Sequence, residues 1–215
     1  MSSKQLPIHV MQKAAKGIGY IAHPLRLRIL EFLDVNGSSS VSVISKGVGE
    51  EATIVSQNLK KLRDAHLVET KRRGLFIYYT ICEEYPASIF YCLRKLFGYM
   101  TNNFYFLQDD YKAVLPRDYT TMTADRIKLF AHFDKMRILE FLVLFGASNV
   151  NRIAEGCNLA PLKVSQFLKK MKEDDFVTVE RKGRFMFYSV LPGIQTTAIK
   201  CIHKRYDSLK NKADF

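Results

Sequence analysis

Hydrophobic residues recur at helical spacing in the stretch that begins at Pro24 and ends at Gly37. The apolar positions are Leu27, Ile29, Leu30, Phe32 and Leu33. Proline is well suited to the first position of a helix, because its missing N–H is not needed there. The pattern therefore predicts a helix with one apolar stripe that faces a core, ended by the glycine.

Three more elements are predicted downstream. A short helix covers Val41–Val48 and is stopped by the sequence GVG, and a third helix covers Ala52–Ala65. Two β-rich runs around a basic, glycine-containing turn predict a hairpin over Leu67–Ile81. Helix, short helix, helix and hairpin, in this order, make a winged helix-turn-helix.

The same pattern occurs a second time, 109 positions further along the chain. AHPLRLRILEFL (Ala22–Leu33) returns as AHFDKMRILEFL (Ala131–Leu142), and about two dozen of roughly sixty positions match without a gap. In the second copy Pro161 opens the third helix and Asp175–Val190 supplies the hairpin. Two copies are too few for a solenoid, so the repeat predicts a tandem duplication of one small domain.

The charge changes this picture. The 215 residues carry 33 Lys and Arg against 21 Asp and Glu, a net charge of +12 at pH 7. An excess of this size favours a polyanionic partner, of which nucleic acid is the commonest inside cells. The alternative is that the charge only keeps the protein soluble.

The location of the protein is expected to be the cytoplasm. No apolar run approaches the roughly 18 residues that a membrane-spanning helix needs, and the first residues lack the apolar segment of a signal peptide. The four cysteines contain no CxxC pair and indicate reduced cytosolic thiols rather than a disulfide framework.

The third helix of each copy has a polar side that could contact DNA. Val55, Leu59 and Leu62 lie on one side of the first copy's helix, which leaves hydroxyl, amide and amine groups on the other. The candidate DNA-binding residues of the two helices are Thr53, Ser56, Gln57, Lys60, Lys163, Ser165, Gln166 and Lys169. Such groups suit base edges in a major groove and the phosphates beside it. The alternative is an ordinary solvated helix face.

The hairpin tips are basic in both copies, with the sequences KRRG (Lys71–Gly74) and ERKGR (Glu180–Arg184). The candidate DNA-binding residues here are Arg72, Arg73, Arg181, Lys182 and Arg184. Cations at the end of a stiff ribbon suit phosphates or a minor groove. Charged strand edges also prevent aggregation between sheets, and both roles can hold at once.

These motifs resemble the ArsR/SmtB group of bacterial winged-helix repressors, which carry a DPTRLRIL helix, a VSxHLKxLxxAGLV recognition helix and a basic wing. The resemblance covers most of each copy. It departs at His23, where the family has Asp, and after the recognition Ser, where His is replaced by Gln57-Asn58 and by Gln166-Phe167. The family forms symmetric dimers through its first and last helices. The resemblance thus implies a dimer fused into one chain.

The expected fold is therefore mainly α (α+β), with two tandem winged helix-turn-helix domains packed as an intramolecular pseudo-dimer. The expected ranges are 1–100 for the first domain, 101–120 for an aromatic linker and 121–215 for the second domain. Aromatic residues between the copies are expected to form the interface core, and a small-molecule pocket among them is the alternative.

Metal binding, the best-known activity of that family, is not expected here. The family's Cys-x-Cys belongs in the short second helix, where this chain has only Cys157, at the end of one copy. Neither last helix supplies the Asp, His and Glu of the family's other metal site. His23 and His132 are expected to be helix caps or packed side chains.

Cys92 and Cys201 also lie 109 positions apart, so the last helices carry thiols at matching places. A redox pair is the less favoured interpretation, and buried structural thiols are the favoured one.

No phosphate loop, GxSxG or paired carboxylates support an enzyme, and no cofactor is expected. The sequence predicts a repressor-like transcriptional regulator that binds double-stranded DNA, with no membrane partner and an effector it cannot name. The alternatives are a winged-helix module that binds another protein or RNA without operator specificity.

Overall fold

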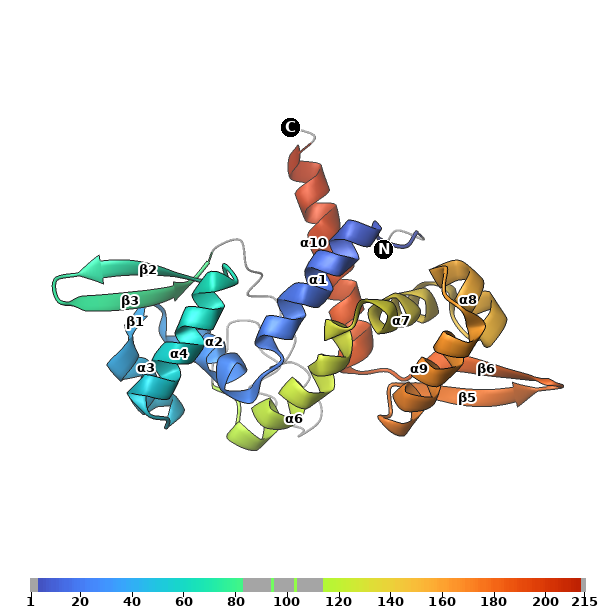
Figure 1. Ribbon diagram of the computed structural model, residues 1–215, viewed down its shortest axis with the longest axis horizontal. Helices are drawn as coiled ribbons and strands as arrows, with labels where there is room; N and C mark the ends of the chain where they lie inside the picture. Colours follow the sequence, from blue (N-terminus) through green and yellow to red (C-terminus); the bar gives the residue numbers. More distant parts are fainter. Residues whose placement is uncertain (1–3, 83–93, 95–102, 104–113, 214–215) are drawn as a thin grey trace. The chain divides into compact units, whose positions relative to one another are not determined.

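A computed structural model describes residues 4–82, 94, 103 and 114–213 of the chain (Figure 1). The described chain forms two compact units. We call Gly17–Lys128 the α4 unit, and we call Met1–Lys16 together with Leu129–Phe215 the α9 unit, after the helix that each presents.

The α4 unit is a bundle of helices with a small sheet. Its helices are α2 (Pro24–Asn36), α3 (Val41–Val48), α4 (Ala52–Asp64) and α6 (Arg117–Ile127). Its strands are β1 (Ser39–Ser40), β2 (Val68–Arg73) and β3 (Phe76–Ile81), in the order β1-β3-β2 and all antiparallel. Helix α6 packs against α2, and the β2–β3 hairpin extends away from the helices (Figure 1).

The α9 unit has the same order of elements. Its helices are η2 (Lys128–Ala131, a 3₁₀ turn at the boundary), α7 (Phe133–Phe145), α8 (Val150–Cys157), α9 (Pro161–Glu173) and α10 (Ile194–Ala213). Its strands are β4 (Ser148–Asn149), β5 (Val177–Lys182) and β6 (Phe185–Val190), in the order β4-β6-β5. Helix α10 packs against α7, and the first turns of α1 (Ile8–Ile21) complete the unit.

The two sheets share one register. Ser39 pairs with Tyr79 in the α4 unit, and Ser148 pairs with Tyr188 in the α9 unit. The predicted helices and hairpins are confirmed in both units, to within one or two residues at their ends. The short strands β1 and β4 were not predicted, because two polar residues carry no strand pattern. The fold is α+β with a winged helix-turn-helix order.

The cores are built from the predicted stripes. Ile29, Leu30, Val55 and Leu59 are fully buried in the α4 unit, and the matching α7 and α9 residues are fully buried in the α9 unit. Gly37 ends α2 with a φ of 69°, a left-handed value that glycine adopts without strain. The prediction that Gly37 ends this helix is confirmed.

A glycine fixes how closely the short helix approaches the first helix of each motif. A Cβ at Gly47 would lie 2.0 Å from Cε2 of Phe32, and a Cβ at Gly156 would lie 2.1 Å from Cε2 of Phe141. Atoms cannot approach that closely, so no other residue fits unless the ring moves. The two glycines therefore allow α3 to pack closely on α2, and α8 on α7.

A buried carboxylate in each unit binds a backbone N–H from a distant segment. In the α4 unit, Leu115 N donates to Glu31 Oε1 at 2.8 Å. In the α9 unit, Leu6 N donates to Glu140 Oε1 at 2.7 Å. Glu31 and Glu140 are the glutamates of the repeated RILEFL, and they are 1% and 0% exposed. Each carboxylate thus anchors the segment that precedes helix α6 or α1.

The compact units divide the chain differently from the predicted ranges 1–100, 101–120 and 121–215. Residues 1–16 associate with the second winged helix, and residues 114–128 associate with the first. Most of the predicted linker 101–120 lies outside the described residues, so those ranges stay a prediction.

Candidate nucleic-acid interface

Helix α4 presents one polar face to solvent. Thr53, Ser56, Gln57 and Lys60 are all exposed. Val55, Leu59 and Leu62, on the other side, have no exposed surface. The predicted orientation of this helix is therefore confirmed, and its hydroxyl, amide and amine groups are available to an outside partner.

Helix α9 presents a similar face with one difference. Ser165, Gln166 and Lys169 are exposed. Lys163 is also exposed, but its Nζ lies 2.6 Å from Asp134 Oδ2 of α7. This ion pair holds Lys163 toward its own unit, so it must be broken or shared before the ammonium contacts a phosphate.

The two helices also differ at the position after the shared Ser-Gln. Asn58 is buried in α4, where its Nδ2 donates to Ile54 O at 2.9 Å. At the matching position of α9, the ring of Phe167 packs edge-on against His132 at 4.9 Å and lies beneath the Nζ of Lys163 and Lys135. The two helices consequently offer related but unequal surfaces.

The wing of the α4 unit is a regular hairpin with cations at its end. Arg72 pairs with Ile77 and Arg73 with Phe76 across the ladder, and all four side chains are exposed. Arg72 Nε donates to Gly74 O at 3.1 Å, and the Arg73 guanidinium lies 5.1 Å from the Tyr78 ring centre. These contacts orient both cations and leave them in solvent.

The wing of the α9 unit has the same backbone with a different charge pattern. Arg181, Lys182 and Arg184 are exposed. Arg181 Nε donates to Gly183 O at 3.1 Å, as Arg72 does in the other wing. Lys182 Nζ lies 3.1 Å from Glu180 Oε2, so a carboxylate partly neutralises this wing.

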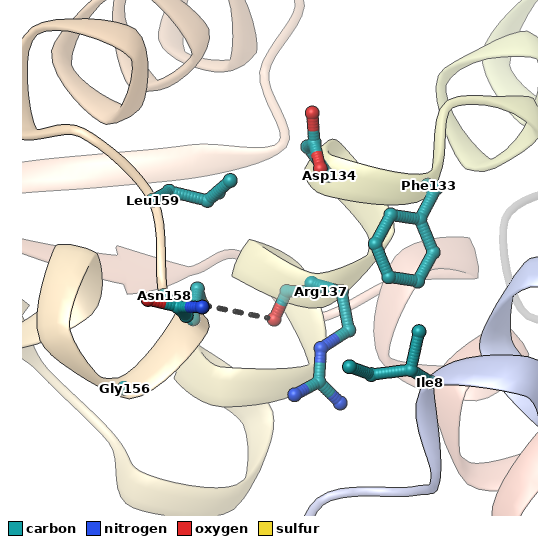
Figure 2. Close-up of a pocket in the computed structure, with 8 residues that line it drawn as sticks. Ile8, Phe133, Asp134, Arg137, Gly156, Asn158 and Leu159 are labelled. Carbon is teal, nitrogen blue, oxygen red and sulfur yellow. Dashed lines mark hydrogen bonds between the residues drawn. The ribbon is translucent and has the colours of Figure 1, made fainter.

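A small pocket of about 220 Å³ opens in the α9 unit between α7 and the end of α8 (Figure 2). Ile8, Phe133, Asp134, Cys157 and Leu159 contribute to its lining. The Cys157 thiol donates to Arg137 O at 3.5 Å, and burial raises the pKa of this thiol to about 11. The thiol is therefore protonated at neutral pH, which makes it a poor metal ligand and a slow nucleophile.

The matching place in the α4 unit is filled by an ion-pair cluster. Glu50 accepts from Arg117 at 2.7 Å and from Arg28 at 3.4 Å. Arg28 also donates to Val48 O. By the 109-residue repeat, Ile8 corresponds to Arg117 and Leu159 corresponds to Glu50. The α9 unit therefore lacks this ion-pair cluster and has a pocket in its place.

The structure describes only some of the residues considered for metal or redox chemistry. In the described part of the chain, no three His, Cys, Asp or Glu side chains are grouped as a metal site. Cys201 is half-buried on α10, and Cys92 lies outside the described residues, so their pairing stays untested.

The two recurring histidines stand at the N-caps of α2 and α7, where neither side chain makes a capping hydrogen bond. His132 packs against Phe167. Burial, followed by the nearby charges of Arg26 and Lys61, lowers the pKa of His23. His23 is therefore uncharged at neutral pH, unlike the acidic residue that the resemblance leads one to expect at this position.

Glu31 and Glu140, whose hydrogen bonds join distant segments within each unit, were not identified from the sequence. The sequence pattern could have identified them, because each is a carboxylate inside an otherwise apolar run on the buried side of its helix. Buried carboxylates need partners, which predicts a donor from elsewhere in the chain. The donors are backbone N–H groups, which no residue pattern identifies.

No helix in the described ranges is both long and apolar enough to cross a membrane. The family model of a helix-turn-helix domain matches residues 21–71, which contain α2, α3, α4 and the start of the wing.

Known proteins similar to this chain include an uncharacterized HTH-type transcriptional regulator of Mycobacterium tuberculosis, 32% identical over 43% of this chain and 82% of its own length. The nodulation protein NolR of Rhizobium meliloti is 34% identical over 40% of this chain and 69% of its own length. The HTH-type transcriptional regulator YgaV of Escherichia coli is 29% identical over 40% of this chain and 87% of its own length. The match and the geometry agree: the chain belongs to the helix-turn-helix transcriptional regulators.

Proposed function

We propose that this protein is a repressor-like DNA-binding regulator of the ArsR type in which a tandem duplication has joined the two subunits of a dimer into one chain. Helices α4 and α9 enter successive major grooves, and the two wings contact the flanking backbone or minor groove. The residues that we assign to DNA are the exposed members of the two polar faces and the basic residues of the wings.

The observation that carries the proposal is the reciprocal exchange of segments. The segment before α1 belongs to the first repeat in sequence but docks on Glu140 of the second. The segment before α6 belongs to the second repeat and docks on Glu31 of the first. A pair of identical subunits that exchange their N-terminal segments has this pattern.

The surface chemistry supports DNA as the partner. The exposed faces of α4 and α9 combine a Ser-Gln pair with lysines, and hydroxyl and amide groups of this kind bind base edges. The net charge of +12 supplies attraction to phosphates. The relatives named as transcriptional regulators point to the same partner.

A gel-shift experiment tests the proposal. Labelled random-sequence duplexes are bound at several salt concentrations and competed with unlabelled duplex or RNA. The proposal predicts binding that duplex DNA competes better than RNA, with log K falling linearly against log salt. Equal competition by RNA would favour an RNA-binding module. No binding to either at low salt would favour an acidic protein partner.

A further inference from the structure

The tip of the wing in the α4 unit carries an apolar side chain where a polar one is expected. Leu75 follows the turn glycine Gly74 and is 89% exposed, and its neighbour Phe76 is 60% exposed. Leu75 therefore leaves nearly all of its side chain in water. A single exposed leucine is common on protein surfaces, so its meaning comes from its place at the tip and from the comparison with the other wing.

The backbone does not require leucine there. The α9 wing has the same strand register, with Arg181 opposite Met186 as Arg72 is opposite Ile77. Its turn glycine has the same conformation, with φ 62° at Gly183 and 61° at Gly74. Yet the α9 wing carries Arg184 where the α4 wing carries Leu75. The shared backbone therefore accommodates either a leucine or an arginine directly after the turn glycine.

Three consecutive cations stand beside the leucine. Lys71, Arg72 and Arg73 are exposed, and none forms an ion pair with a carboxylate in the described ranges. In the other wing, Glu180 takes the place of Lys71 and pairs with Lys182. The α4 wing thus has an apolar residue at its tip and, next to it on β2, three basic residues that no carboxylate in the described ranges neutralises.

This combination fits the minor groove of duplex DNA. The groove is about 6 Å wide, which admits side chains from the tip of a ribbon rather than the ribbon itself, and it is bordered by phosphates on both sides. Apolar wedges such as Leu and Phe enter between base steps from this groove, partly unstack them and kink the duplex. A membrane surface would need a wider apolar area than one tip leucine and its neighbour.

We propose that Leu75 is such a wedge, so that the α4 wing bends the bound DNA while the α9 wing, with Arg184 at its tip, only contacts phosphates or groove edges. This inference rests on the proposed function, since it requires the wings to lie on DNA. It adds an asymmetry that a dimer of identical subunits cannot have: one kink, on one side of the site.

The test uses the full-length protein and 30-bp mixed-sequence duplexes with a fluorophore at each end, either fully paired or with one central mismatch. A mismatch lowers the cost of unstacking, so the wild type should bind the mismatched duplex roughly tenfold more tightly and bring its ends closer together. Leu75→Ala should bind both duplexes about equally and leave the energy transfer near that of free DNA.

Arg184→Ala is the matched control at the other tip. It should keep the bend and the mismatch preference, and it should lower the slope of log K against log salt by about one unit. Leu75→Arg should lose the bend and raise the slope by about the same amount. Both sites are exposed, so circular dichroism should show an unchanged fold.

The outcomes separate the two proposals. Wild-type binding without a bend, or a bend and mismatch preference that Leu75→Ala retains, would overturn the wedge and leave the proposed function standing. A wild type that binds no duplex at low salt would overturn the proposed function as well. Vesicles of phosphatidylcholine with anionic phosphatidylserine complete the set: if Leu75→Ala loses vesicle binding and keeps DNA bending, the tip is a membrane contact.

Discussion

The backbone N–H of Leu6 donates to the carboxylate of Glu140 across 134 positions of the chain, at 2.7 Å. The same carboxylate accepts from His203 Nε2 at 2.9 Å and from Arg137 at 2.9 Å. Both oxygens of Glu140 are therefore occupied. At the matching position Glu31 also accepts from a backbone N–H, but its Oε2 has no partner among the described residues.

This difference predicts that a glutamate-to-glutamine substitution lowers the free energy of unfolding at one of these two matching positions and not at the other. Glu140→Gln places an amide NH₂ opposite a guanidinium and breaks a buried ion pair, which should lower the free energy of unfolding by roughly 3–5 kcal/mol. Glu31→Gln keeps the acceptor for Leu115 and should not destabilise at pH 7.5. Urea unfolding followed by circular dichroism measures both, and hydrogen exchange of α2 and α7 assigns each change to its unit. Equal losses in the two variants would contradict the account.

Stability should depend on pH through Glu31. Burial raises the pKa of Glu31 to about 7 from 4.5, against the hydrogen bond from Leu115 and the charge of Arg94, which lower it. Between pH 4.5 and pH 7, the carboxyl group of Glu31 keeps its proton in the folded protein and loses it in the unfolded chain. The folded state is therefore most favoured below pH 4.5, and this contribution to the free energy of unfolding is lost as the pH rises through 7. Wild type should therefore lose stability from pH 5 to 7.5 relative to Glu31→Gln. A constant difference between the two across that range would show that Glu31 does not titrate there.

The glycines of the short helices should not tolerate a methyl group. Gly156→Ala would place its Cβ on the ring of Phe141 and should cost roughly 1–3 kcal/mol of unfolding free energy. Gly17→Ala is the control, because nothing lies within 4 Å of its Cβ. Alanine in that helix should stabilise by about 0.5–1 kcal/mol. Thermal unfolding of the two variants checks the pair, and a neutral Gly156→Ala would mean that the ring moves freely.

The recognition helices should carry sequence preference. Replacing Gln57 and Gln166 with Ala removes two exposed amides, and each lost base contact should cost about 1–3 kcal/mol of binding free energy. Affinity for a selected operator, measured at fixed salt, should fall while affinity for random duplex and the thermal midpoint stay unchanged. Unaltered operator affinity in the double variant would remove the major-groove assignment.

The wings should differ in their electrostatic contribution. Arg72 and Arg73 have no carboxylate partner in the described ranges, whereas Lys182 is paired with Glu180. Replacing Arg72 and Arg73 with Ala should lower the slope of log K against log salt by about two units. Replacing Arg181 and Lys182 should lower it by less. Titrations at four salt concentrations give the slopes, and unchanged slopes in both variants would show that the wings do not touch DNA.

The sequence predicted the local structure well because local signals determine it. The helix beginning at Pro24, the stop at Gly37 and the apolar side of α4 follow from spacing and from the conformational freedom of glycine. The exposure of Gln57 and Gln166 followed from the same periodicity. Repetition of these signals 109 positions later predicted the second set of elements.

Long-range contacts could not be predicted in the same way. The docking of Leu6 on Glu140 depends on a backbone N–H, which every residue except proline has. The ion pair of Lys163 with Asp134 depends on how α9 packs against α7. Lys163, which we assign to DNA, is therefore paired with a carboxylate rather than free. Such contacts arise from tertiary packing, which helical periodicity does not predict.

In the proposed function, one chain takes the place of a dimer and has two unequal halves. The exposed matched positions Thr53 and Leu162, and Ile54 and Lys163, differ between the two helices, so the two half-sites that they contact should differ as well. Selection of bound sequences from a random duplex pool, combined with light scattering of the purified complex, measures both properties.

We expect one chain for each site and two related, non-identical half-sites, spaced by about one helical turn of roughly 10 bp or a multiple of it. A perfectly palindromic consensus bound by two chains would contradict this expectation.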